Sequence, residues 1–394
     1  MDIIYISSLS SKRNIENLHQ KTRENPGFAV QKFNRLLVRG LIENKQSVIA
    51  LSNPPITRSN TKSLIQPWKN EVEDNIRYKY IPFFNIPFIK HICVFLYVFF
   101  YVLFWGFRNR SKKCVICDSL SISASLAALI ATKVNRVKCC GIFTDIYGLI
   151  VGNKSKSIIN KLATRLHSNC SKMFTHYVLL TDEMNSVVNS NKRPYIVMEA
   201  VCDNSEYRIN SFELVKSPQN IFLYAGGIEE KYGLKMLVDA FILAKDLTAE
   251  LHIYGSGSYV PELLKQCRLD NRVKYLGVVS NDEILEAEKK AIILINPRFT
   301  SEEFTKYSFP SKNMEYMVSG TPVLTTRLPG MPKEYYDYVY FFEGETKEAY
   351  ASSLRRIMDT DPEELLSKGN AAKLFVLREK NNIKQTIRIL EMLK

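Results

Sequence analysis

Short apolar, β-rich runs alternate with helical stretches along almost the whole chain, and this alternation constrains the fold more than any other feature. In the first half, the runs lie at 3–8, 47–52, 114–118, 138–144, 177–181 and 195–199. In the second half, they lie at 220–225, 250–254, 273–276, 291–296 and 322–326. Continuous apolar strands separated by helices are typical of parallel sheets covered on both faces. Two such blocks in series predict an α/β chain of two doubly wound, Rossmann-like domains.

A polar stretch separates the two blocks. Residues 203–219 (DNSEYRINSFELVKSPQ) show no periodicity and are typical of a linker. The first domain is therefore expected at 1–202 and the second at 220–375. The C-terminal segment has a helical pattern, and its apolar stripe needs a partner surface. The stripe consists of Ile383, Ile387, Leu390 and Leu393.

The charges are distributed unevenly between the two halves. Lys and Arg number 54 against 40 for Asp and Glu, which gives a formal net charge of +14. Residues 1–200 hold 28 basic and 12 acidic residues, so the first half is expected to face an anionic partner. Nucleic acid is one such partner. However, the basic residues are spread through the segment without a recognised nucleic-acid motif, so we expect no nucleic acid partner.

The cysteines predict a reducing compartment and no metal site. Cys114 and Cys117 form a CxxC inside an apolar run that is predicted to be a buried strand. Successive strand side chains point to opposite faces, so the two sulfurs diverge. No second CxxC or His pair stands at zinc spacing. The N-terminus MDIIYISS lacks the regions of a signal peptide, and we therefore expect a cytoplasmic protein.

Residues 92–107 (ICVFLYVFFYVLFWGF) form a run of sixteen uncharged positions that is rich in aromatic side chains. A helix that spans a bilayer needs about 20 apolar residues, so this run is too short. Basic residues follow at Arg108, Arg110, Lys112 and Lys113. We expect a wedge in the anionic inner membrane surface, with a buried core helix as the alternative. The predicted wedge side chains are Phe95, Phe99, Phe104 and Trp105, with Tyr97 and Tyr101 at the headgroups.

Three glycine turns follow strands of the second half. The first contains Gly226 and Gly227 and is followed by Lys231, the second contains Gly255, and the third is Gly277-Val278. Adjacent glycines let the backbone approach an anionic group, to which a following helix presents free N–H groups. The alternative for each turn is a tight strand-to-helix connection. All three lie at the carboxyl ends of predicted strands, where open α/β folds bind their ligands.

The segment 307–323 (YSFPSKNMEYMVSGTPV) combines a helix start with charged residues. Ser308 or Ser311 is expected to cap the helix, which ends at Gly320. Lys312 in the first turn opposes the helix dipole, and an anionic ligand there would remove the conflict. Glu315, one turn along, could accept hydrogen bonds from sugar hydroxyls or could simply stabilise the dipole.

With these residues in view, the chain resembles the family 4 retaining glycosyltransferases of the GT-B fold. The resemblance is specific in the strings YAGGIEEKYGLKMLVDAF, LHIYGSGS, RVKYLGVVS, INPR and SFPSKNMEYMVSGTPVL. It is weaker in NPGFAVQKFNRLLVRGL, GIFTDIYGL and YVLLTDEMN. It implies two Rossmann-like domains that face each other across a cleft, with a C-terminal helix of about 376–394 crossing back to the first. The most similar variant contains bacterial enzymes that build capsular, exopolysaccharide or O-antigen chains.

In the second half, the resemblance assigns Glu315 to the second glutamate of the E-x7-E element, which holds the nucleotide ribose. The first glutamate falls on Tyr307, which cannot act as a carboxylate. Gly227 stands where the family often carries an Arg for the diphosphate, and Lys231 stands one residue from the usual Lys. Lys312 could supply the missing charge. Gly277 and Val278 match the loop whose backbone reads the base.

In the first half, the resemblance assigns Asn25-Pro26-Gly27-Phe28 to the family's flexible loop near the diphosphate. Asp145 ends the strand 138–144, where the family commonly holds an acidic or His residue beside the acceptor hydroxyl. An Asp at a strand end is also a common turn residue, and this alternative stays open.

The resemblance thus implies an enzyme that moves a sugar from a nucleotide-diphosphate donor to a lipid-linked saccharide acceptor with retention of configuration. Its catalysis would be positioning and charge stabilisation, without a cofactor and, since no DxD pair is present, without metal. The candidate catalytic residues are Asp145, Lys231 and Lys312. The candidate donor-binding residues are Gly27, Gly226, Gly227, Gly255, Gly277, Val278, Ser308, Ser311 and Glu315. A sugar-nucleotide epimerase of the same fold and a nucleotide-sugar-binding protein without turnover remain as alternatives.

Overall fold

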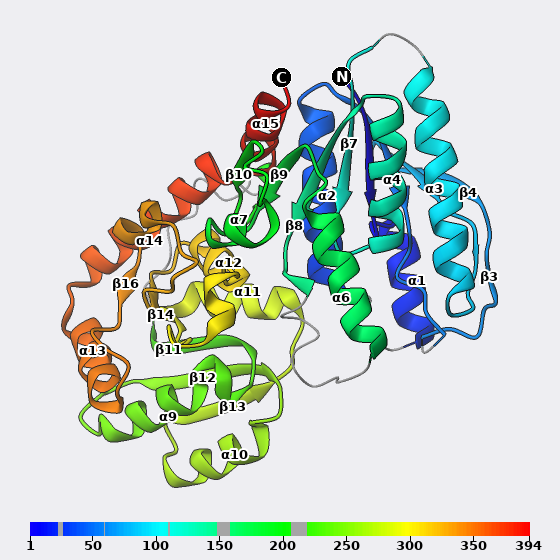
Figure 1. Cartoon of the computed structure of the whole chain (residues 1–394). Helices are drawn as coiled ribbons and strands as arrows, with labels where there is room; N and C mark the ends of the chain where they lie inside the picture. Colours follow the sequence, from blue (N-terminus) through cyan, green and yellow to red (C-terminus); the bar gives the residue numbers. More distant parts are fainter. Residues whose placement is uncertain (23–26, 59, 109–110, 148–157, 206–218) are drawn as a thin grey trace. The chain divides into compact units, whose positions relative to one another are not determined.

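The chain divides into two compact units (Figure 1). Unit 1 consists of Met1–Val201 and Asn382–Lys394, and unit 2 consists of Cys202–Asn381. The computed structural model describes residues 1–22, 27–58, 60–108, 111–147, 158–205 and 219–394. The predicted linker 203–219 therefore lies outside the described residues, except for 203–205 and 219.

Unit 1 is built on a mostly parallel sheet with the strand order β10-β9-β8-β7-β1-β2-β5-β4. Its bounds are β1 (Asp2–Ser7), β2 (Ser47–Ser52), β4 (Lys69–Glu73), β5 (Ile76–Tyr80), β7 (Lys113–Asp118), β8 (Lys138–Phe143), β9 (His176–Leu179) and β10 (Tyr195–Val197). The short strands β3 (Ile65–Gln66) and β6 (Phe83–Phe84) pair antiparallel in a separate sheet. Every apolar run predicted in this half forms a strand, because strands buried on both faces have continuous apolar sequences.

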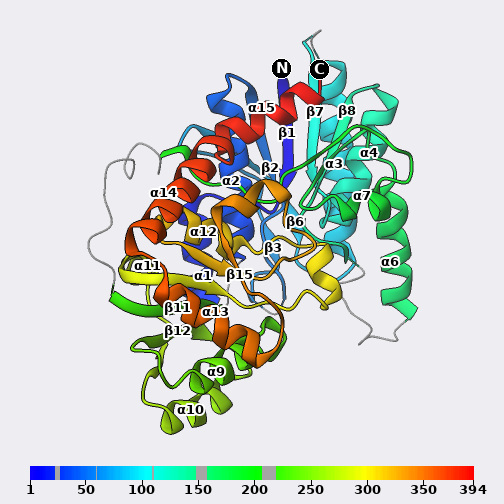
Figure 2. The same cartoon turned by 90° about the vertical axis from the view of Figure 1, so that its left-hand side faces the viewer.

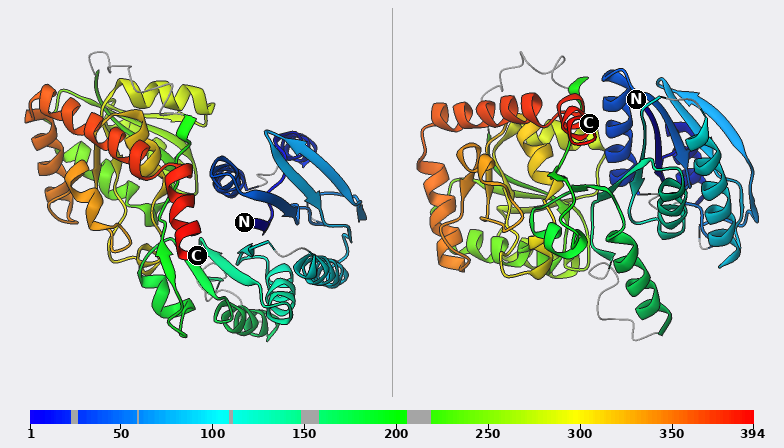
Figure 3. Two further views of the ribbon diagram at one scale, coloured as in Figure 1. Left: turned by 90° about the horizontal axis from the view of Figure 1, so that it is seen from above. Right: turned by 45° about the horizontal axis from the view of Figure 1, so that its top comes forward.

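The sequence analysis missed β4 and β5, which form an antiparallel hairpin at the outer edge of the sheet (Figure 3). Their sequences are KNEVE, which is mostly charged or polar, and IRYKY, in which charged and apolar residues alternate. In β5 this alternation buries Ile76, Tyr78 and Tyr80 and leaves Arg77 exposed. A half-exposed edge hairpin therefore lacks the continuous apolar run by which the central strands were recognised.

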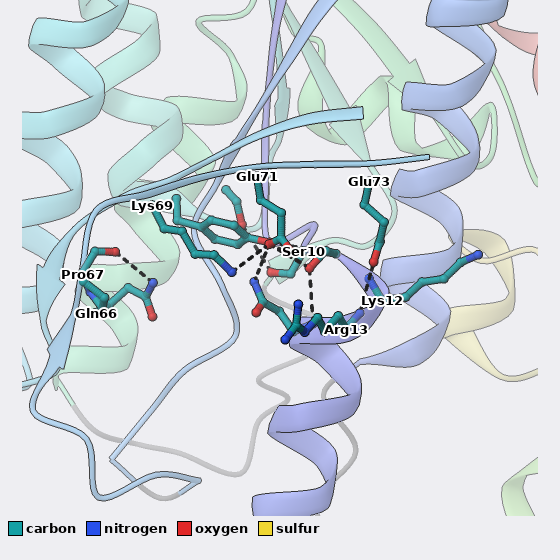
Figure 4. Close-up of polar contacts among 12 residues, drawn as sticks. Ser10, Lys12, Arg13, Gln66, Pro67, Lys69, Glu71 and Glu73 are labelled. Atoms are coloured by element: carbon teal, nitrogen blue, oxygen red, sulfur yellow. Dashed lines mark hydrogen bonds and ion pairs between the residues drawn. The ribbon is translucent and has the colours of Figure 1, made fainter. Parts of the chain in front are cut away.

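This hairpin fixes the segment that follows β1 (Figure 4). The Glu71 carboxylate forms an ion pair with Lys69 and accepts hydrogen bonds from Ser11, Asn14 and Tyr80. The Glu73 carboxylate accepts a hydrogen bond of 2.7 Å from the backbone N–H of Lys12, the first residue of α1. Because the first N–H groups of a helix have no partner within it, this contact stabilises the start of α1.

Seven helices with assigned bounds belong to the described part of unit 1. They are α1 (Lys12–Thr22), α2 (Phe28–Glu43), α3 (Ile89–Phe107), α4 (Ile122–Val134), α6 (Ile158–Ser171), α7 (Glu183–Val188) and α15 (Asn382–Met392). The C-terminal helix α15 packs against α2 (Figure 2), as the resemblance implied, but it begins at Asn382.

The predicted apolar stripe of α15 is only partly correct. Leu393 is buried, whereas Ile383, Ile387 and Leu390 are half-buried. The buried side chains instead are those of Asn382, Gln385, Thr386 and Ile389. Small and polar residues suffice here because Gly40 of α2 lets the two backbones meet: a Cβ at that position would lie 2.2 Å from the carbonyl oxygen of Asn382.

Unit 2 contains a second parallel sheet with the order β13-β12-β11-β14-β15-β16. The strand bounds are β11 (Gln219–Gly227), β12 (Glu250–Ser256), β13 (Val273–Gly277), β14 (Ala291–Asn296), β15 (Val323–Thr325) and β16 (Tyr340–Phe341). The helices are α9 (Leu234–Leu243), α10 (Val260–Leu269), α11 (Asn281–Lys290), α12 (Ser311–Ser319), α13 (Lys347–Asp359) and α14 (Pro362–Glu379), with 3-10 turns η1 (Glu230–Tyr232), η2 (Glu303–Lys306) and η3 (Lys333–Tyr338). The core is formed by strand residues such as Phe222, Leu251 and Ile293 and by Phe241 of α9.

The cysteine pair of β7 is buried, as the sequence predicted. Cys114 and Cys117 are both fully buried, and burial raises the pKa of the Cys114 thiol. In the part of the chain that the structure describes, no group of three or more His, Cys, Asp or Glu side chains could hold a metal ion.

Candidate active site

The three glycine turns of unit 2 lie side by side at the carboxyl ends of adjacent strands. Gly226 of β11 pairs with Gly255 of β12, and Tyr254 of β12 pairs with Gly277 of β13. Gly255 has a φ of 131°, and a Cβ there would lie 1.9 Å from the carbonyl oxygen of Gly226. The close approach of the two strands therefore explains Gly255 without a ligand.

Gly277 differs from Gly255 in its surroundings. Its φ is 73°, in the left-handed region, but none of the described residues lies within 4 Å of a Cβ added to it. Val278, the next residue, is 73% exposed. This turn therefore presents accessible backbone, as a loop that reads a flat ligand must.

Gly227 lies against the ring of Tyr232, which is 3.0 Å from the Cβ that any other residue would carry. The Tyr224 hydroxyl donates a hydrogen bond of 2.6 Å to the Gly227 carbonyl, and burial raises the pKa of Tyr224 to about 12. Two tyrosines therefore hold the backbone of this turn. An Arg side chain at Gly227 would have to displace the ring of Tyr232.

A cation that the sequence analysis missed lies on the same ring. The Arg298 guanidinium is 4.7 Å from the centroid of Tyr232 and 5.9 Å from that of Phe304. Burial lowers the pKa of Arg298, and no ion pair involves this residue among the residues that the structure describes. Arg298 follows β14, a strand that is buried throughout. Its position at the carboxyl end of an apolar run was the sequence signal by which it could have been identified. Lys231, which is exposed, places its Nζ 5.3 Å from the same Tyr232 centroid.

Helix α12 begins at Ser311 with Pro310 as its N-cap, and no side chain caps it. The prediction that Ser308 or Ser311 caps the helix is therefore wrong. Ser311 is already helical, and the Ser308 hydroxyl instead donates to the Phe304 carbonyl at 3.0 Å. Pro310 supplies the fixed φ that suits a helix start, which makes a side-chain cap dispensable.

The two charged residues of α12 contact each other. Lys312 Nζ lies 2.6 Å from Glu315 Oε2, and the two side chains are 35% and 37% exposed. Glu315 thus compensates the cation that opposes the helix dipole. Exposed ion pairs of this kind contribute little to stability. A ligand that binds Lys312 or Glu315 can therefore separate the pair at a small cost in free energy.

The middle of α12 is fastened to the first glycine turn. The hydroxyl of Tyr316 accepts a hydrogen bond of 2.8 Å from the Ala225 N–H and donates one of 3.1 Å to the Ala225 carbonyl. Tyr316 is 1% exposed and neighbours Glu315 in the sequence. Glu315 is therefore held at the same sheet edge as Gly226. Tyr307, which directly follows η2, is half-buried.

In unit 1, two carboxyl groups lie at the carboxyl ends of neighbouring strands. Asp145 follows β8, and Asp118 ends β7, where it pairs with Ile142 of β8. Burial raises the pKa of Asp118 to about 6, the Leu120 N–H lowers it, and the negative charge of Asp145 raises it further. Burial also raises the pKa of Asp145. The sequence analysis did not select Asp118 as a site residue, although the sequence shows an acidic residue at the end of an apolar run.

Asp118 belongs to a buried polar cluster beside β1. The Tyr5 hydroxyl donates a hydrogen bond of 2.5 Å to Asn34 Oδ1, and the Asn34 side chain also contacts Asp118. Gln31 holds the segment after β1 by accepting from the Ser10 N–H at 2.9 Å. These polar groups come from β1, β7 and α2, so only the folded unit brings them together.

Gly27 is the N-cap of α2, with a φ of 81° and only Val30 near an added Cβ. Its left-handed backbone favours glycine. The preceding Asn25 and Pro26 of the predicted loop lie outside the described residues.

Comparison with known proteins gives a family match and a set of similar structures. Residues 219–360 match the family described as Glycosyl transferases group 1. Anabaena Alr3699/HepE in complex with UDP is 13% identical, with a TM-score of 0.63 over 100% of this chain and 99% of that chain. Sucrose-phosphate synthase from Thermosynechococcus elongatus is 13% identical, with a TM-score of 0.62 over 100% and 99%. No curated protein matches the sequence significantly.

A glycosyltransferase from Rickettsia africae is 15% identical, with a TM-score of 0.62 over 100% of this chain and 98% of that chain. At these identities the similarity establishes the fold, which is GT-B, as the family resemblance implied. The family match covers the part of unit 2 that carries the glycine turns, Arg298 and α12. Residues 219–360 of unit 2 thus match a glycosyltransferase domain, and the chain is a glycosyltransferase of the GT-B fold, consistent with the resemblance to family 4.

Proposed function

We propose that this glycosyltransferase moves a sugar from a nucleotide-diphosphate donor to a hydroxyl of a lipid-linked saccharide, with retention, in bacterial surface polysaccharide synthesis. The observation that carries the proposal is the set of groups at one edge of the unit 2 sheet. There, an open glycine turn, two cations on one tyrosine ring and a separable Lys–Glu pair lie at the carboxyl ends of one sheet. The structures named for HepE contain UDP or UDP-glucose, which supports a nucleotide-sugar donor.

In the proposed donor complex, the Lys312–Glu315 pair separates. Glu315 accepts hydrogen bonds from the ribose hydroxyls, and Lys312 turns to the diphosphate. The backbone of Gly277-Val278 contacts the base, because this turn has the space that the neighbouring turns lack. The serines Ser308 and Ser311 stand next to this helix start and can contact the donor phosphates.

The leaving diphosphate gains negative charge as the glycosidic bond breaks. We assign its stabilisation to Arg298 and Lys231, together with Lys312. Arg298 takes over the role of the Arg that is absent at Gly227, because its guanidinium lies on the ring that covers that glycine. Fixed cations in a partly buried site stabilise charge without reorganisation, which is how such groups accelerate a reaction.

On the acceptor side, we assign Asp145 the contact with the attacking hydroxyl, whose proton it accepts or whose direction it fixes. Asp118 is a positioning residue in this proposal. Its carboxyl group ends the neighbouring strand, and the negative charge of Asp145 opposes its ionisation. Burial holds the pKa of each of the two groups above its ordinary value, which favours proton transfer near neutral pH.

A thermal-shift panel followed by a transfer assay tests the function. UDP-, GDP-, TDP- and ADP-sugars are mixed with the protein, and the donor that stabilises it is then supplied with a lipid-linked acceptor extract. We expect one base to stabilise the fold, and acceptor-dependent transfer with retained configuration by NMR. Epimerisation of the donor without acceptor would indicate a sugar-nucleotide epimerase. Stabilisation without any turnover would indicate a binding protein, which would agree with the family's Glu and Arg being replaced by Tyr307 and Gly227.

The acceptor class and the basic first half also support a location at the inner face of the cell membrane. Attachment of the protein there would bring it to acceptors that cannot leave the bilayer.

A further inference from the structure

Helix α3 exposes an apolar row along its entire length. The row follows helical spacing and consists of Ile89, Ile92, Leu96, Phe100, Phe104 and Phe107, which are between 42% and 67% exposed. The opposite side carries Val94, Val98 and Val102, which are at most 1% exposed, in a helix that packs on α4. Helix α3 is thus apolar on both sides, and only one side belongs to the core.

This arrangement corrects the predicted wedge. Of the four apolar side chains named from the sequence, Phe104 is exposed, whereas Phe95, Phe99 and Trp105 are half-buried. Sixteen consecutive apolar residues hide the helical period, so the sequence could not tell the outward row from the inward one. The core alternative is also incomplete, because the outward row stays exposed in the part of unit 1 that the structure describes.

The exposed area is large for a soluble protein. The phenylalanines of the row alone expose roughly 350 Å², and single patches above a few hundred Å² usually mark an interaction site. Further apolar side chains continue it at the start of α3 and on β6, the strand that precedes and contacts the helix. They are Phe84 at 52% and Phe88 at 71% exposed. Figure 1 shows α3 on the outer side of unit 1, beside α4.

The charges around α3 identify the kind of partner. Between Asp74 and Asp118 the sequence holds seven Lys or Arg and no Asp or Glu. Lys79 places its Nζ 5.1 Å from the ring of Tyr101 on α3, and Arg108 and Arg77 act on the same tyrosine, lowering its pKa against the effect of burial. A protein interface normally has a polar rim with both signs of charge. The charged residues of this stretch are all cations, and an apolar row among them is complementary to a bilayer with anionic headgroups.

The position of α3 in unit 1 determines how it meets the bilayer. By length and composition alone, α3 could cross a membrane. However, its end is anchored to neighbouring elements: Asn135 donates to the Val102 carbonyl at 3.2 Å, and Lys113 Nζ donates to the Trp105 carbonyl at 2.8 Å. The chain then enters β7, a central strand of the sheet. Crossing would therefore pull the buried valines away from α4.

We infer that α3 lies flat in the surface of an anionic bilayer. The row from Ile92 to Phe104 enters the acyl boundary, and Arg77, Lys79 and Arg108 contact the lipid phosphates. The row extends from one end of the helix to the other, so the helix axis is parallel to the membrane. This inference adds a partner to the proposed function but rests on a different surface, since no residue of the candidate donor or acceptor site takes part.

Vesicle flotation tests the inference with the full-length protein. The probes are vesicles of phosphatidylcholine alone and of phosphatidylcholine with 30% phosphatidylglycerol. We expect at least tenfold more binding to the anionic vesicles and substantial release by 0.5 M NaCl. The variant with Phe100→Glu and Phe104→Glu is expected to lose at least tenfold in binding. The matched control, Leu264→Glu with Leu269→Glu on α10, changes two exposed leucines (43% and 76%) and is expected to float like the wild type.

Several results would overturn the inference. They are failure of the wild type to float, flotation of the double Glu variant, and resistance of the wild type to both salt and alkaline extraction, which would indicate a spanning helix. A dimer that the Glu variant abolishes, without flotation of the wild type, would indicate a protein partner. If the Glu variant fails to fold, Arg77→Glu with Arg108→Glu supplies the test, because it reverses the charge of two exposed residues that contact the headgroups. The donor-induced thermal shift is measured in each variant and is expected to persist, which separates this inference from the proposed function.

Discussion

Replacing Asp118 by Asn tests the buried carboxyl group at the edge of unit 1. Burial and the neighbouring Asp145 raise the pKa of Asp118 to about 6, from an ordinary value of 3.8. The folded state therefore binds a proton more tightly than the unfolded state does. Stability from this group is present at low pH and is lost as the pH rises from about 4 to about 6. Each pKa unit corresponds to about 1.4 kcal/mol, so the ionised group destabilises the fold at pH 7.5 by at most about 3 kcal/mol.

Asn cannot ionise, and its carbonyl can still accept the hydrogen bond from Leu120 N–H, which is 3.1 Å long in the wild type. We therefore expect Asp118→Asn to raise the free energy of unfolding by about 1–3 kcal/mol at pH 7.5 and to leave it nearly unchanged at pH 4. Urea unfolding followed by circular dichroism at a series of pH values measures this difference. Activity is expected to fall in the same variant, because Asp145 loses its charged neighbour.

The matched control is Asp74→Asn in the exposed turn between β4 and β5. Asp74 has a φ of 51°, a conformation that Asn also tolerates, and it forms only a half-exposed ion pair with Lys12. We expect a small change of stability that does not follow the pH profile of Asp118→Asn. If Asp118→Asn were no more stable than the wild type at pH 7.5, the argument from burial would be refuted.

The remaining predictions concern donor and acceptor. Glu315→Ala should weaken nucleotide binding by roughly 2–4 kcal/mol, measured by calorimetry, while the fold survives; an unchanged dissociation constant would contradict its ribose role. Lys231→Ala and Lys312→Ala should each lower kcat more than they weaken donor binding, because the leaving charge grows in the transition state; a raised KM at normal kcat would reduce the role to binding. Arg298→Ala should behave likewise, with partial recovery in Arg298→Lys, and full activity of the Ala variant would remove Arg298 from the site. Asp145→Asn should bind donor normally but lose transfer in the acceptor assay, and an active variant would make Asp145 a turn residue.

The sequence by itself determined the central strands and the class of fold. The strand AIILIN (β14) is buried at every position, and KCVICD (β7) is buried after its first residue. A strand covered on both faces must be apolar throughout, so its sequence reveals it without knowledge of its neighbours. The strands KNEVE and IRYKY escaped for the same reason, because neither is buried throughout and both mix charged or polar residues with apolar ones.

The composition of the candidate site could not be predicted from residue patterns, because tertiary contacts decide which residues lie together. Gly255 and Gly277 look alike in the sequence, yet one is explained by contact with the next strand and the other opens to solvent. Arg298 lies beside the Gly227 turn because β14 is the neighbour of β11, although 70 residues separate the two positions. Strand order is a non-local property, and no local pattern encodes it.

Helix α3 shows the same division between local pattern and tertiary contact. The sequence established that residues 92–107 form an apolar segment, and the basic residues after it pointed to an anionic surface. Which side of the helix belongs to the core was decided only by its packing on α4, which buries Val94, Val98 and Val102. When every side of a helix is apolar, the hydrophobic effect favours burial of any of them, and only the shape of the neighbouring elements selects one.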